Sequence, residues 1–156
     1  MTLLNAELHI NVSILRENIC YLKTRIDKKS NFLAVVKANA YGHSLEKFVE
    51  KLDDYVDGYA LVRLDEAIKV RDLSKKPILL MQGIYDDDEA LIAKKRDFMC
   101  VLHTQEQIET YSRNLENNNI WLKVNSGMNR LGFSENVLND LNLLTIKPSV
   151  LMSHLA

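Results

Sequence analysis

The chain has 156 residues, of which 47% are hydrophobic and 26% charged, and its formal net charge at pH 7 is −1. This composition is typical of a globular protein, and the length suits one domain or part of a larger one. Without a basic excess we expect no nucleic-acid partner, and the apolar runs are too short to cross a membrane. The start "MTLLNAELHI" lacks the features of a secretory signal, so a cytoplasmic location is expected. Cys20 and Cys100 are interpreted as reduced thiols, and no metal site is predicted.

Apolar runs typical of buried strands alternate along the chain with amphipathic stretches typical of helices. The runs that predict strands are 32–38, 58–62, 78–82, 98–103, 120–126 and 149–155. The stretches that predict helices are 11–26, 44–54, 64–73, 86–95, 104–115 and 134–144. Asn11 and Ser44 are expected to cap the first two helices, and Thr104 with Gln107 forms a capping box for the fifth.

This alternation indicates an α/β protein with a parallel sheet and helical crossovers. A doubly wound sheet would be complete at this length, whereas an eight-stranded barrel would be two strands short. The C-terminal end of each predicted strand carries a polar residue: Lys37, Arg63, Gln82, His103, Asn125 and His154. Six polar strand ends favour the barrel, because in a barrel these ends converge on one active-site mouth.

Lys37 stands at the end of a strongly apolar run, in the stretch "AVVKANAYGHS" of residues 34–44. Lysines often end strands simply because the chain emerges into solvent there. A half-buried lysine can also act as a nucleophilic amine. Spacing alone leaves both interpretations open.

A second informative stretch is "KVNSGMNRLGF", residues 123–133. Lys123 and Arg130 flank a loop that contains Asn125. An arginine on such a loop is a permanently charged donor suited to an oxyanion, although an arginine at this spacing is more often solvated or ion-paired.

These two stretches, together with the terminal "SHLA", resemble bacterial alanine racemase, a pyridoxal-phosphate enzyme of fold type III. The resemblance implies a parallel (β/α)8 TIM-type barrel followed by a C-terminal β-domain. The chain would then hold about six of the eight strands, with residues 1–156 as the N-terminal part of the barrel domain and without the β-domain. Residues 1–10 would form a strand that associates with that missing domain.

The resemblance also implies roles for individual residues. Lys37 matches the lysine that forms a Schiff base with pyridoxal phosphate and serves as one of two acid/base groups. Tyr41 matches the tyrosine that reaches the cofactor phosphate, and Arg130 the arginine that donates to its phenolic oxygen. Lys123 matches a lysine that is carbamylated in several members, and its new carboxylate orients the arginine. His154 matches a histidine in the polar network around the cofactor ring.

Asn125 and Met128 fall at supporting positions near the substrate. Asn125 stands in "NSGM" where Asp-Thr-Gly-Met is commoner, so the negative charge of an aspartate is absent. Ser44 stands where the family usually carries glycine. Neither departure removes a group on which the implied chemistry depends.

The implied function is the interconversion of L-alanine and D-alanine through a Schiff base and proton transfer at Cα, which would supply D-alanine for peptidoglycan. A homodimeric enzyme is expected, because the second base of the family is a tyrosine from the β-domain of the partner subunit. The chain alone is therefore expected to be inactive. Two alternatives are a single-domain protein that binds pyridoxal phosphate without catalysis, and an inactive fragment or interaction module.

Overall fold

The computed structural model describes residues 7–114, 120–134 and 146–154. Within these ranges six strands form one parallel sheet, in which each strand pairs with its neighbours along the chain. The strands are β1 (Leu33–Val35), β2 (Gly58–Leu61), β3 (Ile78–Leu80), β4 (Phe98–Leu102), β5 (Ile120–Lys123) and β6 (Val150–Met152). Each lies inside a predicted range, and each is shorter than that range.

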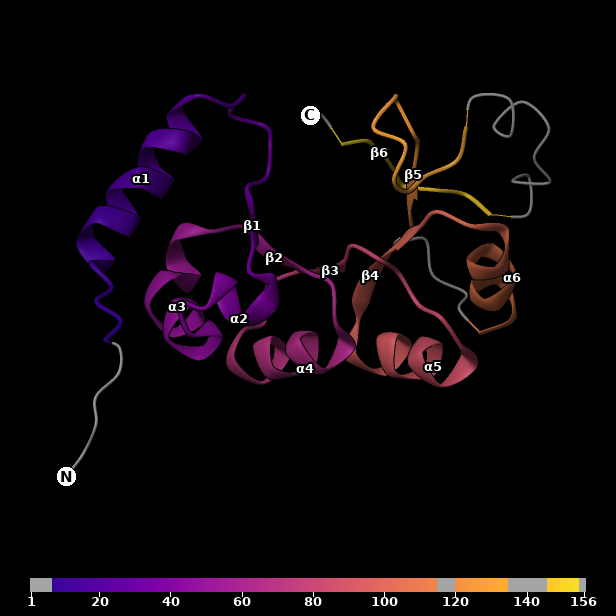
Figure 1. Cartoon of the computed structure of the whole chain (residues 1–156), viewed down its shortest axis with the longest axis horizontal. Helices are drawn as coiled ribbons and strands as arrows, with labels where there is room; N and C mark the ends of the chain where they lie inside the picture. The colour runs from indigo at the N-terminus through magenta and orange to yellow at the C-terminus, as the bar shows by residue number, and fades with distance from the viewer. Residues whose placement is uncertain (1–6, 115–119, 135–145, 155–156) are drawn as a thin grey trace.

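One helix precedes β1 and the others connect the strands from β1 to β5, as the alternation predicted. The helices are α1 (Val12–Thr24), α2 (Lys37–Tyr41), α3 (Leu45–Leu52), α4 (Leu64–Leu73), α5 (Asp87–Arg96) and α6 (Gln105–Asn114), with the 3-10 turn η1 (Asp53–Tyr55) after α3. Figure 1 shows α3 to α6 along the outer side of a curled sheet, with α1 beside its β1 edge.

The strand order β1 to β6 follows the sequence without a reversal. A doubly wound sheet reverses direction at a switch point and places helices on both faces, whereas a barrel adds each strand beside the previous one. The sheet is therefore an open, partial TIM-type barrel, and the predicted fold class is confirmed.

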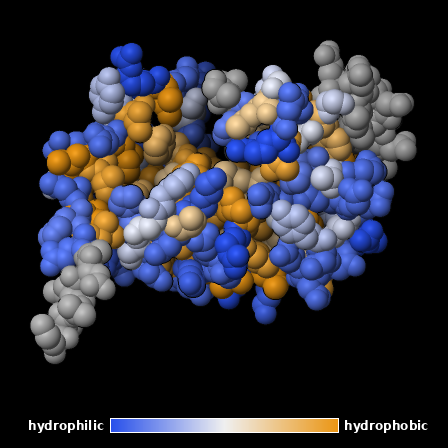
Figure 2. Space-filling model, viewed as in Figure 1, coloured by the Kyte–Doolittle hydropathy of each residue, from blue (hydrophilic) through white to orange (hydrophobic). Residues whose placement is uncertain are grey.

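Strand residues alternate between two apolar layers, because successive side chains of a strand point to opposite faces. Tyr59, Leu61 and Leu80 belong to the main core, which packs under the helices. Ala60 and Leu79 belong to a separate cluster on the concave face, together with partly buried strand residues. Figure 2 shows a hollow at the top of the view whose base is hydrophobic.

Adjacent strands pair in register, so Ala34 lies opposite Tyr59 and Leu80 lies opposite Cys100. Cys100 is buried in the middle of β4, and burial raises the pKa of its thiol to about 12. The thiol of Cys20 on α1 is free and exposed.

Asp57 ties α1 to the sheet. Its carboxylate accepts a hydrogen bond from the backbone N–H of Phe32 at 2.7 Å and from Lys23 Nζ at 2.9 Å. These two bonds lower the pKa of Asp57, with the Phe32 bond as the larger cause. The beginning of α1 is fixed by Asn11, whose side chain accepts from the N–H of Ile14 at 3.1 Å, as predicted.

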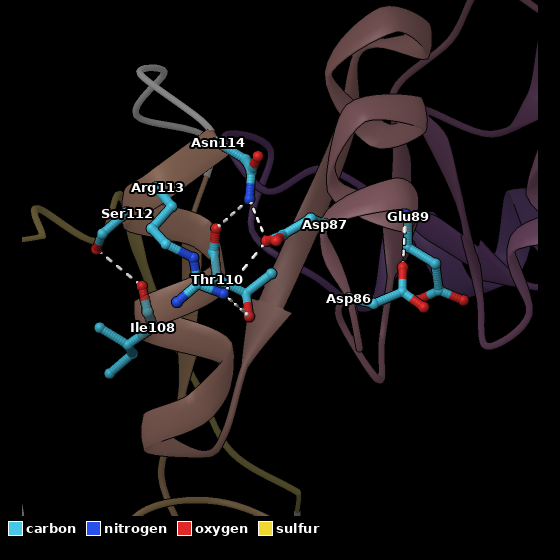
Figure 3. Close-up of polar contacts among 8 residues, drawn as sticks. All are labelled: Asp86, Asp87, Glu89, Ile108, Thr110, Ser112, Arg113 and Asn114. Carbon is cyan, nitrogen blue, oxygen red and sulfur yellow. Dashed lines mark hydrogen bonds and ion pairs between the residues drawn. The ribbon is translucent and has the colours of Figure 1, made fainter.

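Polar side chains join α5 to α6 on the outer surface (Figure 3). Asp87 accepts hydrogen bonds from Asn114 Nδ2 at 2.6 Å and from Arg113 at 3.2 Å. Asp86 caps α5 by accepting from the N–H of Glu89 at 2.8 Å. The acidic run before α5 is therefore a helix start, as its position before a positive dipole end predicted.

Two capping predictions need correction. Ser44 precedes α3, but its side chain makes no capping hydrogen bond, and the N–H of Leu45 donates instead to Asn39 Oδ1 at 2.8 Å. The capping box of α6 is half formed. Thr104 Oγ1 accepts from the N–H of Gln107 at 3.3 Å, whereas Gln107 Oε1 accepts from the N–H of His103 rather than from that of Thr104.

Two expected elements fall wholly or partly on residues that the structure does not describe. The helix expected at 134–144 lies almost entirely outside the described residues. Residues 7–10 have no regular secondary structure and residues 1–6 lie outside the described ranges, so the N-terminal strand stays a prediction. Among the described helices, none has the length and apolar character of a membrane-spanning segment.

Candidate active site

Predicted site residues lie where parallel strands end. Lys123 is the last residue of β5. Its side chain lies on the concave face because it stands two residues after Trp121 of the concave cluster, and residues two apart in a strand share a face. His154 follows β6 by two residues, and Lys37 follows β1 by two residues. The carboxyl ends of the strands therefore carry the candidate chemistry, which is the usual place for an active site in this architecture.

A small pocket, here the β5–β6 pocket, lies at this end of the sheet. It is lined by Lys123, Val124, Asn125, Ser126, Met128, Arg130, Leu131, Ser153 and His154. The structure thus brings together five of the residues predicted from the sequence: Lys123, Asn125, Met128, Arg130 and His154. The ends of β5 and β6 are joined there by Ser153 Oγ, which donates to the carbonyl of Val124 at 3.0 Å.

The loop that carries Arg130 is organised by Asn125. The Oδ1 of Asn125 accepts from the N–H of Gly127 at 3.1 Å and from the N–H of Asn129 at 3.0 Å. Such bonds from an asparagine to the backbone that follows it stabilise tight turns. Asn125 thus bonds to residues of its own loop and organises that loop.

Gly132 closes the loop because the backbone passes very near it. A Cβ at this position would lie 2.7 Å from the N of Asn125 and 2.8 Å from the carbonyl carbon of Val124, and its φ is +115°. Both the space and the dihedral require glycine. The end of the loop is bonded to the end of β5 by Phe133, whose N–H donates to the carbonyl of Lys123 at 2.9 Å.

The pocket is cationic. Lys123 is only 5% exposed, and burial lowers the pKa of its ammonium, with the positive charge of Arg130 as a second cause. None of the described residues that line the pocket is acidic, and no ion pair to Lys123 forms within the described ranges. Two cations without a carboxylate between them make this a place where an anionic group is favoured.

His103 directly follows β4, close to Lys123, and is buried. Its Nε2 lies 3.2 Å from the carbonyl oxygen of Gln82, to which Gln107 Nε2 also donates at 2.6 Å. Desolvation lowers the pKa of His103, and the nearby charge of Lys123 adds to this effect. His103 thus has a buried structural position beside the pocket and does not line it.

Lys37 and Tyr41 do not line the β5–β6 pocket, because they follow β1, at the other edge of the sheet. Lys37 is half-buried, and its Nζ lies 6.0 Å from the centroid of the Tyr41 ring. The two residues are the ends of α2, which the sequence did not predict. Residues Ala38, Asn39, Ala40 and Tyr41 all have φ between 52° and 55°, so α2 is a left-handed turn.

Glu66 was not selected from the sequence, although its carboxylate holds this turn by accepting from two of its N–H groups. Its only sequence signal is a place in the first turn of a helix, which many surface carboxylates share.

No group of three or more potential metal-binding side chains occurs in the described part of the chain.

Comparisons with known proteins agree with these features. Residues 10–156 match the family model described as Alanine racemase, N-terminal domain. The curated alanine racemase of Vesicomyosocius okutanii is 36% identical over 152 residues, which are 94% of this chain and 43% of that protein. The crystal structure of biosynthetic alanine racemase from Pseudomonas aeruginosa superposes with a TM-score of 0.79 and 36% identity, covering 90% of this chain and 42% of that one.

A third relative, alanine racemase from Bartonella henselae with covalently bound pyridoxal phosphate, superposes with a TM-score of 0.81. It is 24% identical and covers 94% of this chain and 44% of that one, so this likeness concerns the fold alone. The chain thus spans about two fifths of the length of these relatives. The alternative of a non-catalytic protein that handles the cofactor is not favoured, since the matching relatives are named as racemases.

Proposed function

Because the chain belongs to the family of the alanine racemase N-terminal domain, we propose that it supplies the cofactor-binding barrel portion of an enzyme that interconverts L-alanine and D-alanine. The observation that carries this proposal is the β5–β6 pocket, where side chains of the motif "KVNSGMNRLGF", among them Lys123 and Arg130, lie beside His154. The barrel portion would comprise residues 1–156, and the remaining part of the enzyme would lie outside them.

The residues of the site suit pyridoxal phosphate. The group carries an anionic phosphate and a phenolic oxygen, and the described lining of the pocket is cationic without an acidic residue. Arg130 would donate to the phenolic oxygen, and His154 would complete the polar surroundings of the ring. Lys37 would hold the group covalently through its amine, and Tyr41 would donate to the phosphate.

When bound, pyridoxal phosphate delocalises the electron pair left at Cα of alanine after a proton is removed. The protein must then move protons on both faces of Cα. Lys37 can take or return the proton on one face only, because its amine approaches from a single strand end. The group that acts on the opposite face would come from the partner subunit of a homodimer.

Lys123 would be carbamylated in the working enzyme. Carbon dioxide reacts with a neutral amine, and the lowered pKa of Lys123 raises the neutral fraction at a given pH. The nitrogen would bond to the carbon of carbon dioxide and release one proton to water. The product is a carboxylate that would pair with Arg130 and remove the charge repulsion between the two side chains. Asn125 and Met128 would support the loop near the substrate.

The remaining proposals follow from the family resemblance. The substrate would be free alanine and the D-alanine would serve peptidoglycan synthesis, in the cytoplasm and without a nucleic-acid or membrane partner.

The proposal is tested with the chain itself and with a longer protein that contains it. After addition of pyridoxal phosphate and reduction with borohydride, peptide mass spectrometry should find the cofactor on Lys37. Lys37→Ala should abolish the adduct and the racemisation of alanine, whereas Lys69→Ala, at an exposed position on α4, should change neither. An adduct distributed over surface lysines, or racemisation that survives Lys37→Ala, would contradict the proposal.

A further inference from the structure

Lys37 is followed at once by an unusual backbone. Ala38, Asn39, Ala40 and Tyr41 adopt φ values of 52°, 55°, 53° and 54°, and none of them is glycine. For L-residues the left-handed conformation costs roughly 1–2 kcal/mol per residue. Such a turn persists only when its surroundings hold it, and it sets the direction in which the side chain before it leaves β1.

Glu66 supplies that hold. Its Oε1 accepts from the N–H of Asn39 at 2.7 Å and its Oε2 from the N–H of Ala38 at 3.3 Å. Successive N–H groups of such a turn form a concave nest that binds anions, and the carboxylate of Glu66 fills it. The contact links residues 27 and 28 positions apart, so it fixes the turn against α4.

The carboxylate has no cation bound to it within the described ranges. Glu66 is 8% exposed, and none of the ion pairs in the described part of the chain includes it. A buried carboxylate without a cation is costly unless hydrogen bonds satisfy it. Its neighbour Asp65 is exposed and pairs with Arg63 at 2.9 Å, without a contact to the turn. The first turn of α4 thus carries two carboxylates with different roles. Asp65 forms a surface ion pair, and Glu66 accepts hydrogen bonds from the backbone that follows Lys37.

We propose that Glu66 is a positioning residue for Lys37: it locks the left-handed turn and thereby fixes where the Lys37 amine lies at the mouth of the barrel. This inference rests on the proposed function for the identity of the group that Lys37 would hold. The lock itself concerns only residues of this chain. Without it the turn can relax toward commoner dihedrals, and the amine then occupies several directions instead of one.

Glu66→Gln is the decisive variant, because it keeps the size of the side chain and one acceptor but places an amide NH2 against the second N–H. Asp65→Asn is the matched control one residue away. Amide hydrogen exchange should accelerate about tenfold or more at Ala38 and Asn39 in Glu66→Gln, as expected for loss of a bond to a charged acceptor. Asp65→Asn should leave both amides within about twofold of the original rate. Unchanged protection in Glu66→Gln would overturn the proposal.

The position of the amine is read without cofactor by competitive acetylation of Lys37 against Lys69, measured by mass spectrometry. The ratio of the two acetylation rates should change by about threefold or more in Glu66→Gln and stay unchanged in Asp65→Asn. A threefold change requires less free energy than the loss of one hydrogen bond provides. A constant ratio despite lost amide protection would show that the turn does not direct Lys37.

In a racemising protein that carries the chain, Glu66→Gln should lower kcat while KM for alanine stays within about twofold, and Glu66→Asp should restore part of kcat. A rise in KM alone would overturn the positioning role. If the unsubstituted protein forms no adduct at Lys37, the proposed function fails, whereas the exchange and acetylation results still decide whether Glu66 positions the amine.

Discussion

The guanidinium of Arg130 acts on Lys123 within the β5–β6 pocket, where its positive charge adds to burial in lowering the pKa of the Lys123 ammonium. The two cations are neighbours without a carboxylate from any described residue between them. This arrangement is unfavourable in itself and becomes favourable when an anion joins it. Both the stability and the chemistry of the site should therefore depend on what occupies the space beside Arg130.

Lys123→Met should change how the melting temperature of the chain responds to carbon dioxide. In buffer depleted of carbon dioxide the variant should melt about 2–4 °C higher, because it removes a largely buried charge that pairs with no described residue. With bicarbonate the unsubstituted protein should gain stability and the variant should not. Calorimetry in the two buffers measures this difference. A bicarbonate effect of equal size in both proteins would argue against carbamylation of Lys123.

The pH dependence of the same residue has a definite sign. The unfolded chain holds the Lys123 proton up to its ordinary pKa of 10.5, whereas the folded chain releases it at lower pH. The free energy of unfolding should therefore rise with pH between the lowered folded pKa and 10.5. Lys123→Met should lose this part of the slope. Urea unfolding across the alkaline range, in buffer depleted of carbon dioxide, gives the comparison.

In a racemising protein that carries the chain, Arg130→Ala should lower turnover by about two orders of magnitude or more, since a fixed donor to developing charge is removed. The adduct at Lys37 should still form, because Lys37 follows β1, at the other edge of the sheet from Arg130. Arg130→Lys is the matched variant, since it keeps the charge but loses the planar fork. Stopped-flow turnover and borohydride trapping separate the two effects. Turnover close to that of the unsubstituted enzyme in Arg130→Ala would assign the arginine a structural role only.

His103 should make the fold sensitive to mild acid. Its ordinary pKa of 6.5 is lowered in the folded protein by desolvation and by Lys123. The stability it contributes is complete above pH 6.5 and is lost as the pH falls toward the folded value, by up to about 1.4 kcal/mol per pH unit. His103→Gln should flatten this part of the stability curve. The same acid sensitivity in the variant would show that another group causes it.

Ser44→Gly should stabilise the chain. Ser44 has φ 68° and ψ 102° and makes no capping bond, so its Cβ is strained without compensation. Relief of about 1–3 kcal/mol should exceed the entropy cost of glycine, about 0.5–1 kcal/mol. Ser44→Ala keeps the Cβ and serves as control. Equal melting temperatures for the glycine variant and the unsubstituted chain would refute the strain.

The sheet could be predicted because its strands are short apolar runs separated by amphipathic stretches of regular length. α4 was predicted at its observed bounds, since "LDEAIKVRDL" combines an acidic start with a regular apolar face. The meeting of Asn125 and His154 could be anticipated because parallel strand ends converge, whereas the places of Lys123 and Arg130 in the site were implied by the family resemblance.

The turn after Lys37 could not be predicted. Four residues without a glycine argue locally against a left-handed backbone, and the distant carboxylate of Glu66 contributes to reversing that preference. The cap of α3 was assigned to Ser44 for the same reason: helix caps are usually adjacent in sequence, whereas Asn39 reaches Leu45 across the folded turn. Contacts that depend on tertiary structure carry little local signal.

The two cysteines lie in contrasting environments, so their reaction with a thiol reagent can measure opening of the sheet. Cys20 should react with a thiol reagent immediately, whereas Cys100, in the middle of β4, should react only when the sheet around it separates. The second labelling rate, read at increasing reagent concentration, therefore measures how often the barrel wall opens under native conditions. Any ligand that closes the mouth of the barrel should slow that rate while leaving Cys20 unaffected.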